Sequence, residues 1–119
     1  HRVLKPGGIL ILREPIFSMG DWRKKRPGLT SRERGIPPKL LTKMIESLGF
    51  NIELAKPCMV PLTPRIAKLF GITFAYNSPV MVRLDEALSK VTAWNMRYHR
   101  ESLPQKMAPT SLYIMASKS

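Results

Sequence analysis

An uninterrupted aliphatic segment near the start of the chain constrains the fold more than any other feature. Ile9 to Leu12 are four consecutive aliphatic residues, and the polar Arg13-Glu14-Pro15 follows them. A strand that is apolar at every position is typical of an inner strand of a parallel sheet, with both faces buried. The preceding Lys5-Pro6-Gly7-Gly8 favours a turn. The sequence therefore predicts an α/β fold built around this strand.

A helix and a second strand are predicted next. Residues 17–36 are loop-like, and Pro37-Pro38 then suits the start of a helix. Apolar residues recur at helical spacing from Leu40 to Leu48, and Gly49 is suited to ending the helix. Residues 50–54 alternate between apolar and polar, which indicates a strand. A strand–helix–strand unit of this kind connects two parallel strands.

The segment between this second strand and a last predicted strand, residues 111–116, is expected to be mainly helical. Thr63-Pro64 suits the start of a short helix that ends at Gly71, and residues 72–82 carry no clear pattern. Residues 83–100 are predicted to form a longer helix, with Asp85, Glu86, Arg97 and Arg100 placed to complement its dipole. One apolar stripe, which we expect to pack inward, comprises Leu84, Leu88, Val91, Trp94 and Tyr98.

In this order the elements resemble the last part of a class I, Rossmann-like methyltransferase that uses S-adenosylmethionine. Leu4-Lys5-Pro6-Gly7-Gly8 resembles the turn before the fifth strand of that family, and Leu48-Gly49-Phe50 its junction before the sixth. Residues 113–118 resemble the closing seventh strand. The resemblance implies the last three strands of the sheet, with flanking helices and the final strand antiparallel between the other two. Residues 1–119 would form a single C-terminal fragment of the domain, with residues 55–108 as a helical lid or insertion.

The resemblance also implies what the chain lacks. Family members hold S-adenosylmethionine with a glycine-rich turn after the first strand and an acidic residue after the second. This sequence has no G-x-G, and Gly7-Gly8 precedes a strand instead of following one. The cofactor therefore belongs to the parent protein, and we expect this chain to have no cofactor site and not to be catalytic alone. Its expected partner is the missing N-terminal half of the domain, and a start at His1 instead of Met fits a fragment.

Candidate site residues lie beyond the end of the first predicted strand, because ligands of open α/β sheets bind at the carboxyl ends of the strands. Methyl transfer requires close alignment of the acceptor and sometimes a base. Glu14 and Asp21 are the candidate bases, although either carboxylate could simply be paired or solvated. The acceptor is expected to be a small molecule. Candidate residues for binding it are Arg13, Ser18, Trp22, Arg32 and Arg34.

Charge and composition leave two other functions open. The chain carries 20 Lys and Arg against 8 Asp and Glu, a formal net charge of +12, which favours anionic partners. The cluster from Trp22 to Arg26 could bind a nucleic-acid backbone or another polyanion, or it could be a solvated basic loop. A noncatalytic fragment that forms homo-oligomers through an exposed strand edge is the second alternative.

Cysteine, histidine and hydropathy argue against several other classes. A single Cys58 cannot form an internal disulfide and fits a cytoplasmic protein. One cysteine and two histidines are too few to indicate a metal site. No apolar run is long enough for a membrane span.

Overall fold

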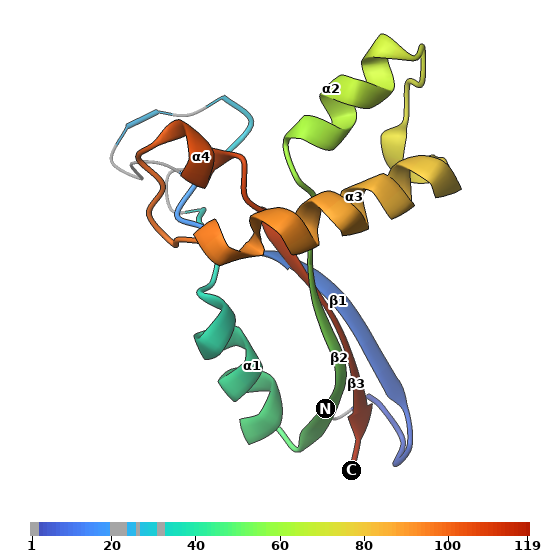
Figure 1. Cartoon of the computed structure of the whole chain (residues 1–119). Helices are drawn as coiled ribbons and strands as arrows, with labels where there is room; N and C mark the ends of the chain where they lie inside the picture. The colour runs from blue at the N-terminus through green and yellow to red at the C-terminus, as the bar shows by residue number, and fades with distance from the viewer. Residues whose placement is uncertain (1–2, 20–23, 26, 31–32) are drawn as a thin grey trace.

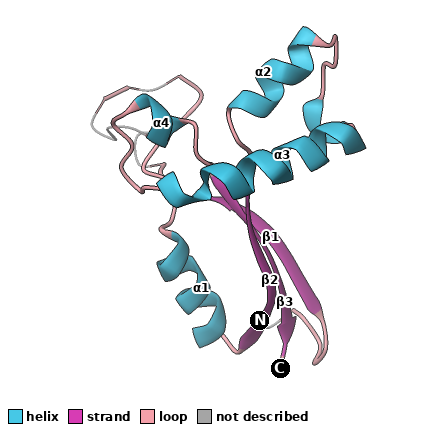
Figure 2. Cartoon of the chain, in the orientation of Figure 1, coloured by secondary structure: helices cyan, strands magenta, loops and turns pink. Residues whose placement is uncertain are grey.

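A computed structural model of the chain describes residues 3–19, 24–25, 27–30 and 33–119. The fold is α/β, with a three-stranded sheet and flanking helices (Figures 1 and 2). The strands are β1 (Ile9–Pro15), β2 (Phe50–Cys58) and β3 (Ser111–Lys118). Helix α1 (Pro38–Ser47) lies between β1 and β2 in the chain. The elements between β2 and β3 are all helical: α2 (Leu62–Leu69), η1 (Ala75–Asn77), α3 (Pro79–Thr92), η2 (Ala93–Asn95) and α4 (Leu103–Lys106).

The last strand lies in the middle of the sheet. The strand order is β1-β3-β2, and β3 is antiparallel to both neighbours. Ile114 of β3 pairs with Leu12 of β1 on one side and with Ala55 of β2 on the other. Since both outer strands oppose β3, β1 and β2 run in the same direction without touching. The expected antiparallel final strand is confirmed.

Two glycine positions explain how the chain enters β1 and β2. Gly7 has a φ of +76°, and its N–H donates to the carbonyl of Lys118 at 3.0 Å, so the turn before β1 is tied to the end of β3. Gly49 has a φ of +81° and ends α1 directly before β2. Left-handed backbone of this kind is adopted by glycine at little cost. The turn and the helix end predicted at these residues are therefore confirmed.

Helix α1 covers one face of the sheet. Leu41 and Ile45 of α1 are buried, and they pack with Phe50 of β2 and with Ile114 of β3. Leu10 and Leu12 of β1 face the same core. Leu41 and Ile45 are four residues apart, which is the helical spacing predicted from the sequence, so the burial of these two side chains follows directly from the pattern.

The other face of the sheet contradicts one prediction. Ile9 and Ile11 are 58% and 59% exposed, although β1 was expected to be buried on both faces. Among the described residues β1 is an edge strand, and α1 packs only on the face of Leu10 and Leu12. A strand needs a layer on each side to bury both sets of side chains. In the described part of the chain, the core under α1 is the one layer along β1, and Ile9 and Ile11 on the other face therefore stay exposed.

The helices between β2 and β3 also depart from the predicted pattern. α3 begins at Pro79, where the Ser78 side chain accepts from the N–H of Met81 at 3.5 Å, and η2 follows it from Ala93. The predicted helix over residues 83–100 is therefore wrong at both ends. α2 starts at Leu62, before the predicted Thr63-Pro64, and β2 runs on through Pro57 to Cys58. An edge strand tolerates Pro57 because one side of its backbone needs no partner strand.

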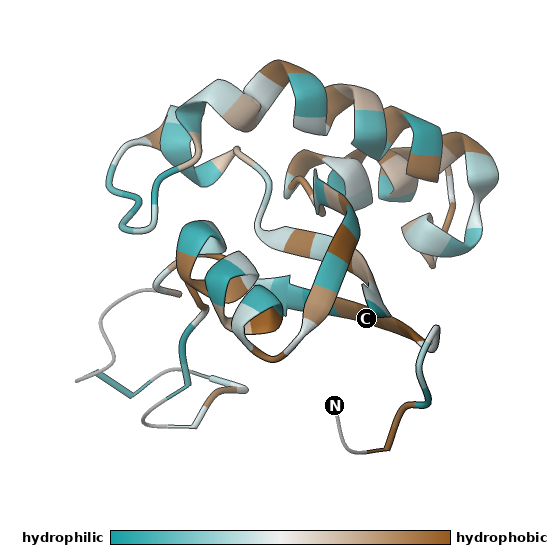
Figure 3. Cartoon of the chain, turned by 90° about the horizontal axis from the view of Figure 1, so that it is seen from below, coloured by the Kyte–Doolittle hydropathy of each residue, from teal (hydrophilic) through white to brown (hydrophobic). Residues whose placement is uncertain are grey.

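The predicted apolar stripe along α3 and η2 points inward only in part, because Leu84 packs against a buried cluster whereas Val91 and Trp94 do not. Val91 is 69% exposed and Trp94, in η2, is 80% exposed, whereas Asp85 and Ser89 are buried. Figure 3 shows apolar and polar residues mixed along this helix, which runs across the top of that view. The reason lies in hydrogen bonds to Asp85, described below. None of the helices in the described part of the chain is long and apolar enough to cross a membrane.

Candidate functional site

The segment that follows β1 is held on both sides by backbone hydrogen bonds. The N–H of Ile16 donates to the carbonyl of Thr110 at 3.0 Å, and the N–H of Ser18 donates to the carbonyl of Tyr98 at 2.8 Å. From the opposite side, the N–H of Gly35 donates to the carbonyl of Phe17 at 3.1 Å. Residues 15–18 are thereby fixed at the carboxyl end of β1, which is the end of the sheet where a site was expected.

Gly35 allows this close approach. A Cβ at this position would lie 2.5 Å from the carbonyl oxygen of Phe17 and 2.6 Å from that of Pro15. Backbone oxygens cannot move aside as a flexible side chain would, so a larger residue would push the two segments apart. The Tyr98 hydroxyl donates to the Gly35 carbonyl at 2.9 Å and links the same layer to the segment after η2.

Arg100 joins three segments at this end of the sheet. Its Nε donates to the carbonyl of Arg97 at 3.0 Å, and its two terminal nitrogens donate to the carbonyls of Ala108, at 2.7 Å, and of Pro109. The guanidinium carbon also lies 5.0 Å from the centre of the Phe17 ring, which is within the range of a cation–π contact. Burial lowers the pKa of Arg100, because it disfavours the charged form.

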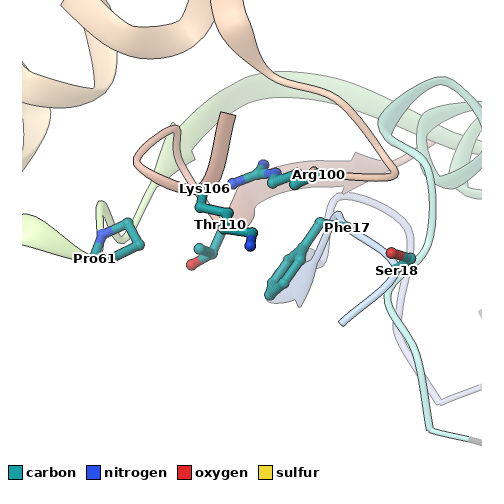
Figure 4. Close-up of a pocket in the computed structure, with 6 residues that line it drawn as sticks. All are labelled: Phe17, Ser18, Pro61, Arg100, Lys106 and Thr110. Atoms are coloured by element: carbon teal, nitrogen blue, oxygen red, sulfur yellow. The ribbon is translucent and has the colours of Figure 1, made fainter. Parts of the chain in front are cut away.

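A cavity of about 290 Å³ opens beside Arg100 (Figure 4). Its walls come from four parts of the chain: the end of β1, the start of α2, the segment around α4 and the residue before β3. Figure 4 shows these side chains around one space, with Pro61 at one end and Ser18 at the other. The lining residues are Phe17, Ser18, Pro61, Arg100, Lys106 and Thr110.

The cavity wall is itself anchored. The Thr110 hydroxyl donates to the carbonyl of Met59 at 2.8 Å, and the Thr110 N–H donates to the same oxygen at 3.2 Å. Met59 has a φ of +64°, a backbone conformation that is uncommon for a residue with a side chain. This geometry fixes the chain between β2 and α2 against the start of β3.

Of the predicted site residues that the structure describes, one lies at the cavity. Ser18 lines it. Arg13 is exposed on the face of β1 that α1 does not cover, and it donates to the sulfur of Met59. Glu14 is half-buried and, as the next residue in the strand, points to the opposite face. Arg13 and Glu14 therefore lie on opposite faces of the sheet, and neither is among the residues that line the cavity, although both were expected at the site.

The other predicted site residues lie in the loop between β1 and α1. Arg34 is exposed and is not among the residues that line the cavity. Asp21, Trp22 and Arg32 lie outside the described residues. That Phe17, Arg100, Lys106 and Thr110 are neighbours was not predicted from the sequence. Arg100 had been assigned to a helix end, because the helix was predicted to continue to that residue.

A second polar cluster lies at the end of β2, centred on Asp85. This carboxylate is 4% exposed and accepts from the N–H of Met59 at 2.8 Å and the N–H of Val60 at 2.9 Å. The hydroxyls of Thr63 and Tyr76 donate to it at 2.6 Å and 3.4 Å. The expectation that Asp85 serves the dipole near a helix start is wrong. Its side chain instead ties α3 to the connection between β2 and α2.

The buried carboxylate of Asp85 contributes to raised pKa values of two neighbouring groups. Burial, and then the charge of Asp85, raise the pKa of Tyr76 to about 12. The same two causes, in the same order, raise the pKa of the Cys58 thiol. Cys58 therefore stays protonated at neutral pH, which disfavours a role as a nucleophile. We interpret this cluster as a structural clamp and the cavity beside Arg100 as the candidate site.

No group of three or more histidine, cysteine, aspartate or glutamate residues in the described part of the chain is placed to hold a metal ion.

Comparison with family models, with curated proteins and with solved structures finds no match to this chain.

Proposed function

We propose that this chain forms the C-terminal, acceptor-side segment of a methyltransferase that uses S-adenosylmethionine. The observation that carries the proposal is the strand order β1-β3-β2, with β3 antiparallel between two strands of equal direction. This is the arrangement that the resemblance implies for the last three strands. Gly7 and Gly49 support it, since both adopt the left-handed backbone at the turn and the helix end that carry the resemblance.

The site also lies where the proposal needs it. In open α/β sheets, ligands bind beyond the carboxyl ends of the parallel strands, and the cavity beside Arg100 opens beyond the ends of β1 and β2. None of the described residues that line this cavity carries a carboxylate. In the proposed function the residues that line the cavity bind and orient a small-molecule acceptor. The role of Asp21 as a base stays a prediction, because this residue lies outside the described part of the chain. The helices between β2 and β3 would close over the acceptor as a lid.

The described residues do not fit the cofactor itself. Gly7-Gly8 lies before β1, where its backbone pairs with the end of β3 through Lys118. The described residues that line the cavity include no carboxylate to hold ribose hydroxyls. We therefore assign the cofactor site to an N-terminal half of the same domain and derive no step of the reaction from this chain alone.

The exposed side of β1 is the surface where such a half would dock. Ile9 and Ile11 are more than half exposed there, and the outer edge of β1 is not paired with another strand in the described part of the chain. An unpaired edge next to apolar side chains favours the addition of a further strand. The same surface in a second copy of this chain is the alternative occupant, and the oligomeric mass distinguishes the two.

The experiment compares two polypeptides. One is this chain, and the other is the natural reading frame that contains it. We expect saturable binding of S-adenosylmethionine by the longer polypeptide and none by residues 1–119, measured by isothermal titration calorimetry. S-adenosylhomocysteine serves as the competing ligand. A longer polypeptide that folds but does not bind the cofactor would contradict the proposal, as would an upstream sequence without a strand followed by a glycine-rich turn.

A further inference from the structure

The cavity beside Arg100 contains positive charge that no carboxylate among the described residues balances. The described hydrogen bonds of Arg100 all go to backbone carbonyls, of Arg97, Ala108 and Pro109. The ion pairs between described residues join Glu86 to Lys56 and to Lys90, and neither lies at this cavity. Burying a cation without an anionic partner is unfavourable, and the lowered pKa of Arg100 reflects that cost.

A second cation lines the same space. Lys106, from the last turn of α4, is exposed and reaches the cavity together with Arg100, as Figure 4 shows. Two hydroxyls, of Ser18 and Thr110, also line it, and none of the described lining residues is acidic. The remaining walls, Phe17 and Pro61, are apolar and reduce the screening of the two charges.

We propose that this cavity binds the carboxylate or phosphate group of a small-molecule ligand. Arg100 and Lys106 supply the opposite charge, and the guanidinium carries more N–H donors than its three carbonyl bonds use. If the proposed function holds, this ligand is the methyl acceptor, so the inference in that form rests on the proposed function. The binding of an anion by this chain does not depend on it.

The size of the cavity separates this ligand from a polyanion. A volume of about 290 Å³ is at the small end of the range for ligand pockets and accommodates a single substituted ring. A nucleic-acid backbone would instead be bound along a broad basic surface. Lys24 and Lys25 are exposed, do not line the cavity and would suit that kind of contact.

The test uses phenyl phosphate and benzoate as probes, with phenol as the neutral control. Each is titrated into the chain and followed by the amide resonances of Ser18, Lys106 and Thr110 in two-dimensional NMR spectra. We expect saturable shifts at these amides with both anions and not with phenol. Substitution Lys106→Met keeps most of the side-chain length but removes the charge, and we expect roughly fivefold weaker binding. Lys43→Met, on the exposed side of α1, is the control with the same change in net charge.

Arg100 is tested with a conservative variant, because its carbonyl bonds also hold the fold. Arg100→Lys keeps the positive charge, so we expect it to retain part of the binding of phenyl phosphate in a sample whose spectrum shows a folded protein. The inference is overturned if no anion produces saturable shifts, if phenol binds equally well, or if Lys43→Met weakens binding as much as Lys106→Met. It is also overturned if heparin binds and displaces no probe while the probes shift only amides outside the cavity.

The two proposals can fail separately. Binding of S-adenosylmethionine by the longer polypeptide together with no anion binding in the cavity would remove this inference and leave the proposed function. Anion binding by this chain together with no cofactor binding by the longer polypeptide would remove the proposed function and leave this inference.

Discussion

The sheet under α1 and the helices between β2 and β3 are held together in different ways. Under α1 the contacts are apolar, with Ile45 of the helix packed against Ile114 of the central strand. Between β2 and β3 a small apolar cluster around Ala67 is joined by a buried polar contact, in which Asp85 accepts hydrogen bonds from the connection between β2 and α2. Apolar packing is tolerant of direction, whereas each hydrogen bond fixes an orientation. These hydrogen bonds therefore fix the orientation of α3 relative to the connection between β2 and α2, although much apolar surface of the helical segment remains exposed.

The largest effect should come from the centre of the apolar region. Ile114 is fully buried in the core between the sheet and α1, so Ile114→Ala removes buried methyl groups and leaves a cavity. We expect it to lower the free energy of unfolding by about 4 kcal/mol. Chemical denaturation followed by circular dichroism measures this loss.

Ile11→Ala is the matched control, since it makes the same change on the exposed face of the same sheet. Ile11 is 59% exposed, so in this chain we expect a loss of less than about 1 kcal/mol. Equal losses at the two positions would show that the exposed face of β1 is covered in solution. That result would point to self-association, which sedimentation would then detect.

The next largest effect should come from Asp85. Asp85→Ala leaves the N–H groups of Met59 and Val60 and the hydroxyl of Thr63 without their acceptor, and we expect a loss of about 3 kcal/mol. Hydrogen exchange should show the loss mainly in α2 and α3, with the protection of β3 retained. Loss of protection throughout the sheet would instead mean that the two regions unfold as one unit.

Glu86→Ala is the control for this substitution. Glu86 is the next residue in α3, and its carboxylate pairs with Lys56 and Lys90 at the surface. We expect little change in stability, because exposed ion pairs contribute little. Asp85→Asn should still destabilise the protein. Both carboxylate oxygens of Asp85 accept hydrogen bonds, and the NH₂ group that replaces one of them cannot accept.

The sequence predicted the apolar region better than the polar one, for a physical reason. The burial of Leu41 and Ile45 depends on spacing within a single helix, which is visible in the sequence. The inward orientation of Asp85 depends on Met59, Val60 and Thr63, which precede it by more than twenty residues. No local pattern contains that information, so Val91 and Trp94 were wrongly expected to face inward.

The candidate site shows the same limit. Ser18 was predicted from its place after a strand, but Arg100, Lys106 and Thr110 come from separate segments that only the folded chain brings together. The roles of Asp21, Trp22 and Arg32 stay predictions. The antiparallel central strand was predictable only through the family resemblance, because spacing alone does not fix strand order.

The smallest effect concerns the outer edge of the Asp85 cluster. The Tyr76 hydroxyl donates to Asp85 at 3.4 Å, and Tyr76→Phe removes this long and partly exposed bond, at a cost below about 1 kcal/mol at neutral pH. The pKa of Tyr76 in the folded protein is raised from 10.0 to about 12. A raised pKa means that the folded state holds the proton more tightly than the unfolded state. The contribution of Tyr76 is then fully present below pH 10 and is lost as the pH rises to about 12.

The difference in stability between the original chain and Tyr76→Phe should therefore shrink through this range, measured by urea denaturation at a series of pH values. The same comparison in an Asp85→Ala background is the control. There the pH dependence should be weaker, because the negative charge that adds to the effect of burial is gone. An unchanged pH dependence would show that burial alone raises the pKa of Tyr76, and that the polar cluster ends at Thr63.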